Sequence, residues 1–479
     1  MKRIALSMGL FSLLTLANAE TPVKSLSLNE AITLAVRTNP NVQSSQLSYV
    51  AQKFNTEVQA WEFQPHYAFQ ASFMQTRSAS DNQPFDNSHE WNATPSISVL
   101  TPIGTQVSLT SDNTDTTHYN PGLSLQIMQP LMRGFGRAVV ESALNNAKDA
   151  EVISRLSNEG VVKTTITNVI DGYLDVVASE KNVAIDQAAL KRATLAVTQT
   201  KLFIKAGHKA GNEIVTVQAN AASAQSVLEN DTNNLLQAKY NLLQAIGLDP
   251  NANLNFSSVD LDALINQYQN ISLDETKKLV LENDIQYQID TITLNGPTAR
   301  SVLVAEDNTR WQLNLTANAA TGNGGGGGDN AGVDSLFNGA NQNQSVGLTL
   351  TIPIGDKLNE QAVVNAKISL KQAELALMQE KWAKETSAIT AWNNVKSSAR
   401  ALVFAKNAEG YQEKTYQVSY QKYTYGLIDS LELQSAQNEL ISAQQIYLSS
   451  EINYIKSLVA LDMLIGHTLA TWKVTVRLS

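Results

Sequence analysis

The chain has 479 residues and a formal net charge of −9, and it contains no cysteine. An acidic chain lacks the basic surface that a nucleic-acid-binding protein needs to meet phosphates. The absence of cysteine excludes disulfides, thiol catalysis and cysteine-ligated zinc. With 43% hydrophobic and only 16% charged residues, the chain is too apolar to be disordered and too evenly polar to be a bundle of membrane helices.

The first residues are typical of a secretion signal. Two basic residues precede an apolar run, residues 4–16, which is too short to span a bilayer. An A-x-A cleavage site follows and ends at Ala19. We therefore predict that residues 1–19 are a signal peptide, that Glu20 begins the mature chain, and that the protein is exported.

Long stretches without proline predict long helices. No proline lies between Pro130 and Pro250, and none follows Pro353. Proline in a helix interior costs about 3 kcal/mol, so proline-free stretches rich in Ala, Leu, Gln and Lys permit unusually long helices. The expected helices cover residues 29–63, 138–206, 212–246 and 362–424.

The expected helix over residues 212–246 carries a coiled-coil stripe. Apolar residues recur at spacings of three and four from Ile214 to Ala245, and only Asp231 interrupts them. Spacing that averages 3.5 residues is typical of a coiled coil. A single amphipathic core helix would show the same stripe, but several uninterrupted helices of this length favour a bundle or a coiled coil.

Other regions alternate between apolar and polar residues, as strands with one apolar face do. A further candidate hairpin, within residues 91–112, shows the same alternation but has no counterpart in the second half of the chain. Two interpretations of it are open, because it either adds strands to a sheet or elaborates the rim. The four regions that occur in both halves are residues 67–74, 123–128, 311–316 and 348–352.

The same order of elements occurs twice. Leu28 in a helical pattern matches Leu273, 245 positions later, and Gly247 matches Gly466, 219 positions later. We therefore predict one duplicated unit of helix, strands, long helix and helix, and not an array of short repeats. The predicted boundaries are residues 20–255 for the first repeat, 256–466 for the second and 467–479 for a C-terminal tail.

The four strands expected from the repeats cannot form a closed β-barrel alone. Four strands leave two open edges, and an unpaired edge is not tolerated in lipid. Closure in a membrane therefore requires an oligomer in which each subunit supplies a few strands. The predicted fold is mainly helical, with membrane β-strands contributed to a shared wall.

This organisation resembles the TolC-type outer-membrane efflux proteins over about residues 26–466. One support is the strand end Gln129–Leu131, which leads through a glycine-containing segment into the long helix. A second support is the turn Tyr423–Gly426 with the helix that follows it, and its first-half counterpart is Lys205–Gly207.

The resemblance implies a homotrimer with a twelve-stranded β-barrel in the outer membrane, four strands from each chain. An α-helical coiled-coil tunnel would continue it into the periplasm. With four strands from each chain, residues 91–112 are expected at the rim of the barrel. The family's ducts are passive and work with a periplasmic adaptor (a membrane fusion protein) and an inner-membrane pump of the RND or ABC type. They serve efflux or type I secretion, contact outer-membrane lipid and use no cofactor.

The resemblance also implies a periplasmic entrance at the helical turns, constricted by acidic residues near the second turn. Gly426 marks that turn, and Gly207 marks its first-half counterpart. Aligned on Gly426, Glu432 takes the position of the first acidic residue and Ser435 takes that of the second. A ring of carboxylates repels itself and attracts cations.

Three residues close to the second turn complete this comparison. Tyr423 keeps the aromatic residue before the turn, and Asp429 adds a carboxylate one helical turn before the acidic position. Ile428 stands where the family has a basic residue that helps to hold the closed state. The alternative interpretation of these carboxylates is that they are solvated residues on a helix face.

Two other classes of protein fit the sequence less well. A periplasmic adaptor has one helical hairpin flanked by β-domains and would not show the duplication. A secreted enzyme needs catalytic or metal-ligating residues at suitable spacing, and neither the five histidines nor the carboxylates supply one. Residues 322–327 formally fit G-x-G-x-x-G, but they lie between two expected strands and favour a hairpin tip.

Overall fold

The structure is a computed structural model that describes residues 25–79, 86–115, 119–252, 254–268, 271–322, 336 and 342–475. The predicted signal peptide, with its cleavage site between Ala19 and Glu20, and the glycine-rich run after Gly322 lie outside these residues. The chain forms two compact units, and each takes segments from both predicted repeats. The first unit comprises Met1–Asn39, Asn168–Asn266 and Ala405–Ile452, and the second comprises Pro40–Thr167, Gln267–Phe404 and Asn453–Ser479.

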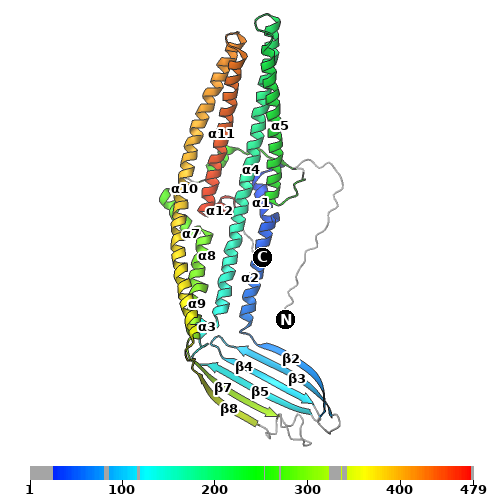
Figure 1. Ribbon diagram of the computed structural model, residues 1–479, viewed down its shortest axis with the longest axis vertical. Coiled ribbons are helices and arrows are strands. Elements are labelled where there is room, and N and C mark those ends of the chain that lie inside the picture. The colour runs from blue at the N-terminus through cyan, green and yellow to red at the C-terminus, as the bar shows by residue number, and fades with distance from the viewer. Residues whose placement is uncertain are drawn as a thin grey trace. The chain divides into compact units, whose positions relative to one another are not determined.

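Helices dominate the described chain (Figure 1). The prediction of very long helices is confirmed, because α4 and α10 have 64 and 68 residues. The first predicted helix is divided at Asn39, because a new helix begins at Pro40, whose missing N–H costs nothing in a first turn. The helices are α1 Leu28–Thr38, α2 Pro40–Trp61, α3 Arg137–Val140, α4 Ser142–Lys205, α5 Glu213–Ile246, α6 Leu261–Gln267, α7 Leu273–Asn283, α8 Ile285–Thr293, a π-helical turn Leu294–Thr298, α9 Ala299–Asn308, α10 Lys357–Thr424, α11 Ser430–Leu464 and α12 Thr468–Thr471.

None of the helices within the described ranges is both long and apolar enough to cross a membrane.

The second unit contains one antiparallel sheet in the order β2-β3-β4-β5-β7-β8 (Figure 1). The expectation of four strands in each chain is wrong. Residues 91–112 lie in β3 and β4, and these strands pair with each other and with β2 and β5 inside the sheet instead of standing at a rim. The strands are β2 His66–Ser78, β3 Asp86–Leu100, β4 Gln106–Asp115, β5 Tyr119–Pro130, β7 Gln312–Gly322 and β8 Gln342–Thr351, and the first unit has a parallel pair, β1 Ser25–Leu26 with β6 Asn255–Phe256.

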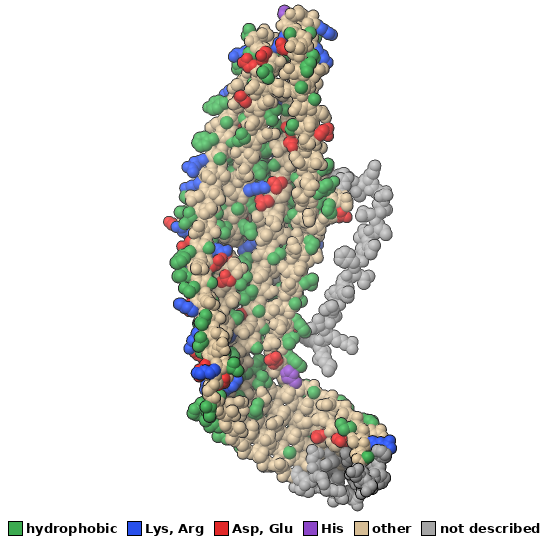
Figure 2. All heavy atoms as spheres, viewed as in Figure 1, with side chains coloured by type: hydrophobic (Ala, Val, Ile, Leu, Met, Phe, Trp, Pro, Cys, Tyr) green, Lys and Arg blue, Asp and Glu red, His purple; other side chains and the backbone are tan. Residues whose placement is uncertain are grey.

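The sheet has one apolar and one polar face. The strand registers place apolar side chains of all six strands on the same face, and many of them are exposed, including Phe69 at 71% and Val346 at 78%. The rings of Phe73 and Trp91 meet across β2 and β3 with centroids 4.5 Å apart. The opposite face carries mainly Ser, Thr, Asn and Gln, and the face of the sheet visible in Figure 2 shows few hydrophobic side chains.

Matching glycines end the helices of both halves. Gly207 and Gly426 follow α4 and α10 with φ of +74° and +73°, and Gly247 and Gly466 end α5 and α11 with φ of +86° and +80°. At each end the N–H after the glycine donates to a carbonyl five residues earlier, as in His208 N to Phe203 O at 2.9 Å. This is the Schellman motif, in which glycine takes the left-handed conformation without a steric cost.

The first unit is organised around Tyr173 of α4. Its side chain is fully buried, and its hydroxyl oxygen lies 2.9 Å from the Leu26 carbonyl oxygen and 2.7 Å from the Ser257 carbonyl oxygen. These carbonyls belong to β1 and to the residue after β6. The ring also packs edge-on against Phe256, with centroids 5.7 Å apart. A single aromatic side chain therefore fixes this parallel strand pair against α4.

The second unit has an apolar core between α7, α10 and α11. Ile271, Val280, Ala388, Leu461 and Ile465 form this cluster of buried side chains. Where α11 ends, the Asn283 side chain donates to the Ile465 carbonyl at 2.9 Å, which satisfies one of the acceptors that a helix end leaves open. Burial and a polar cap thus act together at this helix end.

We predict that Gly247→Ala destabilises the protein by about 2–4 kcal/mol. A left-handed alanine costs about 1 kcal/mol, and here the added Cβ would meet the Asn39 Cα at 2.7 Å and the Thr38 carbonyl oxygen at 2.8 Å. Both are backbone atoms, so the overlap adds about 1–3 kcal/mol. The matched control is Gly207→Ala, because Gly207 has the same left-handed conformation but open space around its Cβ position.

The control should lose only about 1 kcal/mol. Denaturant unfolding of the helical circular-dichroism signal measures both variants. Equal losses for the two variants would contradict the close packing of α5 against the end of α1.

Candidate functional site

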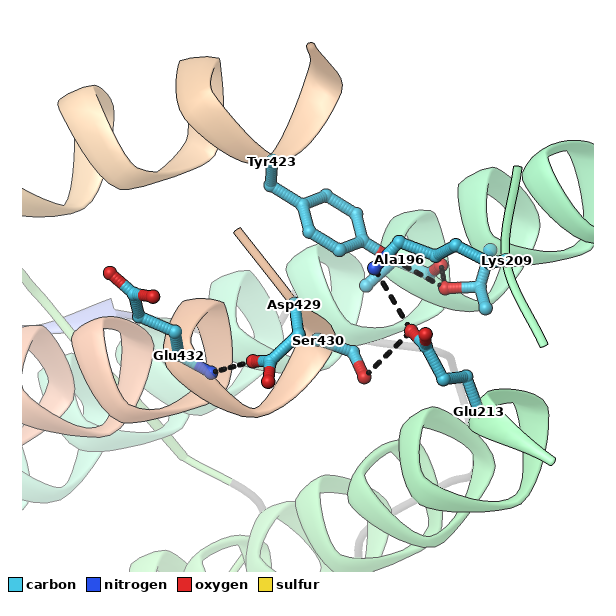
Figure 3. Close-up of polar contacts among 8 residues, drawn as sticks. Ala196, Lys209, Glu213, Tyr423, Asp429, Ser430 and Glu432 are labelled. Carbon is cyan, nitrogen blue, oxygen red and sulfur yellow. Dashed lines mark hydrogen bonds and ion pairs between the residues drawn. The ribbon is translucent and has the colours of Figure 1, made fainter. Parts of the chain in front are cut away.

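The candidate site lies in the first unit, where the turn between α4 and α5 meets the turn between α10 and α11 (Figure 3). Gly207 and Gly426 end α4 and α10 with the same Schellman hydrogen bonds. No side chain stands within 4 Å of the Cβ position of either glycine. The two glycines therefore serve the backbone reversal and not the packing.

Tyr423, the aromatic residue singled out before the second turn, is fully buried. Its hydroxyl lies 2.6 Å from the Thr200 hydroxyl, and Thr200 donates to the Ala196 carbonyl at 2.8 Å. The Tyr423 hydroxyl is therefore the donor to Thr200. The ring also packs edge-on against Phe203, with centroids 5.9 Å apart. Tyr423 thus joins the last turn of α10 to the last two turns of α4.

A lysine of the first turn completes the surroundings of this tyrosine. The Lys209 ammonium lies 4.5 Å from the centroid of the Tyr423 ring, and only 8% of the lysine side chain is exposed. The same ammonium contacts the Glu213 carboxylate at 2.9 Å. Glu213 also accepts a hydrogen bond of 3.3 Å from the Ser430 hydroxyl at the start of α11. One carboxylate therefore connects the N-termini of α5 and α11 (Figure 3).

The predicted acidic residues lie outside this cluster. Asp429 caps α11, because its side chain accepts the Glu432 backbone N–H at 2.8 Å. The side chains of Glu432 and Ser435 are exposed, and the Glu432 carboxylate points away from Glu213 in Figure 3. The structure brings Tyr423 into contact with the first turn and leaves Glu432 and Ser435 free for other contacts.

Sequence reasoning missed Lys209, Glu213 and Thr200. The signal was present, since the offset of 219 that relates Gly207 to Gly426 also relates Lys209 to Ile428 and Glu213 to Glu432. The first turn thus carries a lysine and a glutamate four residues apart, a spacing that favours an ion pair on a helix. The second turn carries only the glutamate. The charge at the first turn is neutralised within the chain, and the charge of Glu432 is not neutralised in this way.

Two acidic side chains meet between α4 and α5. Asp186 is 2% exposed, and a side-chain hydrogen bond joins it to Asp231, the residue that interrupts the apolar stripe. Burial, followed by the hydrogen bond with Asp231 and its charge, raises the pKa of Asp186 to about 7. Asp186 borders a polar cavity of about 340 Å³ whose lining includes Asn220 and Gln437. The Asp186 carboxyl therefore ionises only near neutral pH in the folded chain.

The arrangement offers hydrogen bonds and ion pairs. Within the described part of the chain, no group of three or more His, Asp or Glu side chains is placed to hold a metal ion. The polar contacts join helix ends that are far apart in the sequence. Such contacts position two helical hairpins against each other.

We predict that Asp186→Asn makes the protein more stable at pH 8 and changes nothing at pH 3.5. Below the ordinary pKa of 3.8 the carboxyl is mostly protonated whether the chain is folded or unfolded, so its burial carries little ionisation penalty. Between pH 4 and pH 7 the unfolded chain ionises first, because the folded pKa is about 7 against an ordinary value of 3.8. Stability is therefore lost as the pH rises through this window.

The full shift in the Asp186 pKa would lower the free energy of unfolding by about 4 kcal/mol. Solvent near the polar cavity screens the charge, so we expect Asp186→Asn to gain about 1–2 kcal/mol at pH 8. Denaturant midpoints from pH 3.5 to pH 8 measure the gain. Glu229→Gln, an exposed change on the same helix as Asp231, is the control. Parallel profiles for the wild type and Asp186→Asn would contradict the raised pKa of Asp186.

Comparisons with known proteins agree with this geometry. The sequence profile of the family described as outer membrane efflux protein matches residues 304–467. None of the curated protein sequences compared with the chain matches it.

Solved structures match over nearly the whole chain. The outer-membrane channel OprN has 15% identity and a TM-score of 0.70, covering 92% of this chain and 89% of OprN. CusC has 14% identity and a TM-score of 0.71, covering 95% and 96%. The open state of the Neisseria gonorrhoeae MtrE outer membrane channel has 14% identity and a TM-score of 0.67, covering 92% and 88%. The chain therefore resembles the TolC-type outer membrane efflux proteins in sequence over residues 304–467 and in fold over 92% of its length, which confirms the resemblance drawn from the sequence.

Proposed function

We propose that the chain is the subunit of a passive, homotrimeric export channel in the outer membrane that extends into the periplasm. The channel is the exit duct of a tripartite efflux pump or a type I secretion system. A periplasmic adaptor and an inner-membrane pump of the RND or ABC type supply the energy and the cargo. The duct opens and closes at its two helical turns.

The two-faced sheet is the observation that carries this proposal. Its apolar face exposes Tyr67, Phe69 and Leu348 at 76%, 71% and 63%. A contiguous apolar surface of this kind is costly in water and is typical of a membrane-facing or partner-facing surface. The opposite face is polar, as the lumen side of a transmembrane strand is. The apolar face suits contact with lipid, and the polar face suits contact with water.

The helices favour a duct over an adaptor. An adaptor is expected to have one helical hairpin, whereas this chain has two, α4 with α5 and α10 with α11. Both hairpins end in the same glycine motif, so each half supplies an equivalent element. The similar solved structures are channels, with an open state described for MtrE and transmembrane channel formation for CusC, and this likeness supports the proposal.

The two turns have different roles in the proposed entrance. Lys209, Glu213 and Ser430 connect the turns within one chain and hold the closed arrangement. Glu432 and Asp429 provide the negative charge of the entrance, with Ser435 in the second position of the ring. The backbone reversals at Gly207 and Gly426 end the two long helices beside these residues.

Fractionation tests the proposed function directly. The protein should be found in the outer membrane and should migrate as a trimer that dissociates on heating. A water-soluble monomer in the periplasm would contradict the channel and would favour an adaptor or another soluble protein.

We predict that Lys209→Gln raises the basal conductance of the purified channel in planar lipid bilayers. The change removes the cation over the Tyr423 ring and its contact with Glu213. Loss of about 1.4 kcal/mol from the closed state would raise the open population about tenfold. The control is Lys205→Gln, because Lys205 is an exposed lysine at the end of α4 and loses the same charge. Equal conductance in both variants would remove Lys209 from the closing contacts.

We predict that Glu432→Ala weakens the block of the channel by multivalent cations by about tenfold, because a ring of carboxylates binds such cations. Single-channel recordings with a trivalent cation on the periplasmic side measure the half-blocking concentration. Glu229→Ala removes an exposed carboxylate from the middle of α5 and should leave the block unchanged. Unchanged block in Glu432→Ala would show that this residue faces away from the entrance.

A further inference from the structure

The hairpin formed by β3 and β4 is a full part of the sheet. Its first strand pairs with β2 from His66↔Ser98 to Ser78↔Asp86. Its second strand pairs with β5 from Gln106↔Met128 to Asp115↔Tyr119. These ladders are as long as the others in the sheet. In the described sheet the hairpin connects β2 to β5, so it belongs to the sheet itself.

The hairpin has the same apolar and polar faces as the other strands of the sheet. Ile97 and Val99 lie on the apolar face, in register with Leu109 and Val107. On the polar face the Asn92 side chain donates to the Asp112 carboxylate at 2.6 Å and to the Thr114 hydroxyl at 2.9 Å, a network made entirely by β3 and β4. The hairpin is therefore built to stand between lipid and water.

The turn between β3 and β4 is fixed to the segment that leads into α3. Gly104 has a φ of +96°, and a Cβ at this position would meet the Gly134 carbonyl oxygen at 2.6 Å. The Gly136 N–H donates to the Ile103 carbonyl at 3.2 Å. This close approach of two backbones is possible only with glycine at position 104. The insertion is thus fixed at its base, beside the first turn of the helical region.

The two outer strands of the sheet fit a second copy of the same chain. β2 and β8 each pair on one side only in the described sheet. Six is an even number and all neighbours are antiparallel, so β2 and β8 run in opposite directions. The β8 strand of one copy can therefore pair antiparallel with the β2 strand of the next. Both strands carry their large apolar side chains on the same face, so the apolar surface continues across the junction.

From these observations we infer that the trimer forms a closed β-barrel of eighteen strands and that the β3–β4 hairpin sets the width of the barrel lumen. The inference rests on the proposed trimeric channel. With strands about 4.8 Å apart and tilted by about 40°, eighteen strands give a backbone radius of about 18 Å, against about 12 Å for twelve. Closed walls of 16–18 strands enclose an aqueous channel. The outer-membrane section therefore admits solutes that a twelve-stranded wall of the same design would exclude.

Electron cryomicroscopy of the native trimer in lipid nanodiscs tests the strand count. Eighteen strands in a section through the membrane region are expected, six from each chain. A trimer with twelve strands and the hairpin outside the wall would overturn the inference and leave the channel intact. A particle that is not a trimer, or that does not enter lipid, would overturn the proposed function as well.

Polymer exclusion gives a second, functional test. Removal of residues 86–118 joins the end of β2 to β5 and preserves the inward and outward alternation, because even-numbered residues face the polar side in both strands. The radius of the polyethylene glycol that half-blocks entry from the extracellular side should fall by about a third, in proportion to strand number. An unchanged cut-off in a deletion variant that still forms trimers would refute the role of the hairpin.

Discussion

The structure depends on the backbone hydrogen bonds that one chain cannot complete. A strand at the edge of a sheet presents a row of N–H and C=O groups, and a hydrocarbon environment offers no water to satisfy them. Here β2 and β8 present such rows beside exposed apolar side chains. In the proposed channel the sheet is therefore one sector of a barrel, and neighbouring copies of the chain satisfy its edges. Trimer formation and membrane insertion follow from this single constraint in the proposed channel.

Helix ends impose a second, independent constraint. The long helices have no interior proline, so only their caps define where the chain reverses. The four Schellman glycines reverse it at equivalent places in the two halves, at Gly207 and Gly426 and at Gly247 and Gly466. The serines that begin α1 and α7, Ser27 and Ser272, accept hydrogen bonds in the same way. The hydrogen bonds at the caps thus set the lengths of the helices, whereas other residues determine how the helices pack.

Much of this fold can be predicted from the sequence, because the helices and most strands have a strong period and clear ends. The place of residues 91–112 could not be predicted, because a rim hairpin and a wall hairpin alternate in the same way and differ only in register. Pro95 and Pro102 also interrupt the pattern there. The contact of Lys209 with Tyr423 joins the two halves, and spacing within one half contains no information about it. Which carboxylates line an entrance depends on neighbouring chains.

The contacts between the helices change in kind along the first unit. Near Tyr173, α4 packs through fully buried apolar and aromatic side chains. Farther along the same helix, polar contacts with α10 and α11 are added to the buried apolar ones, as in the hydrogen bonds from Gln199 to the Tyr420 hydroxyl at 2.8 Å and from Gln437 to the Ala189 carbonyl at 3.0 Å. A hydrogen bond that water can replace contributes only about 1 kcal/mol net, whereas a separated apolar core loses its full burial energy. In the proposed channel, the polar contacts near the turns are therefore the ones that cost least to separate, which is why we place the entrance there.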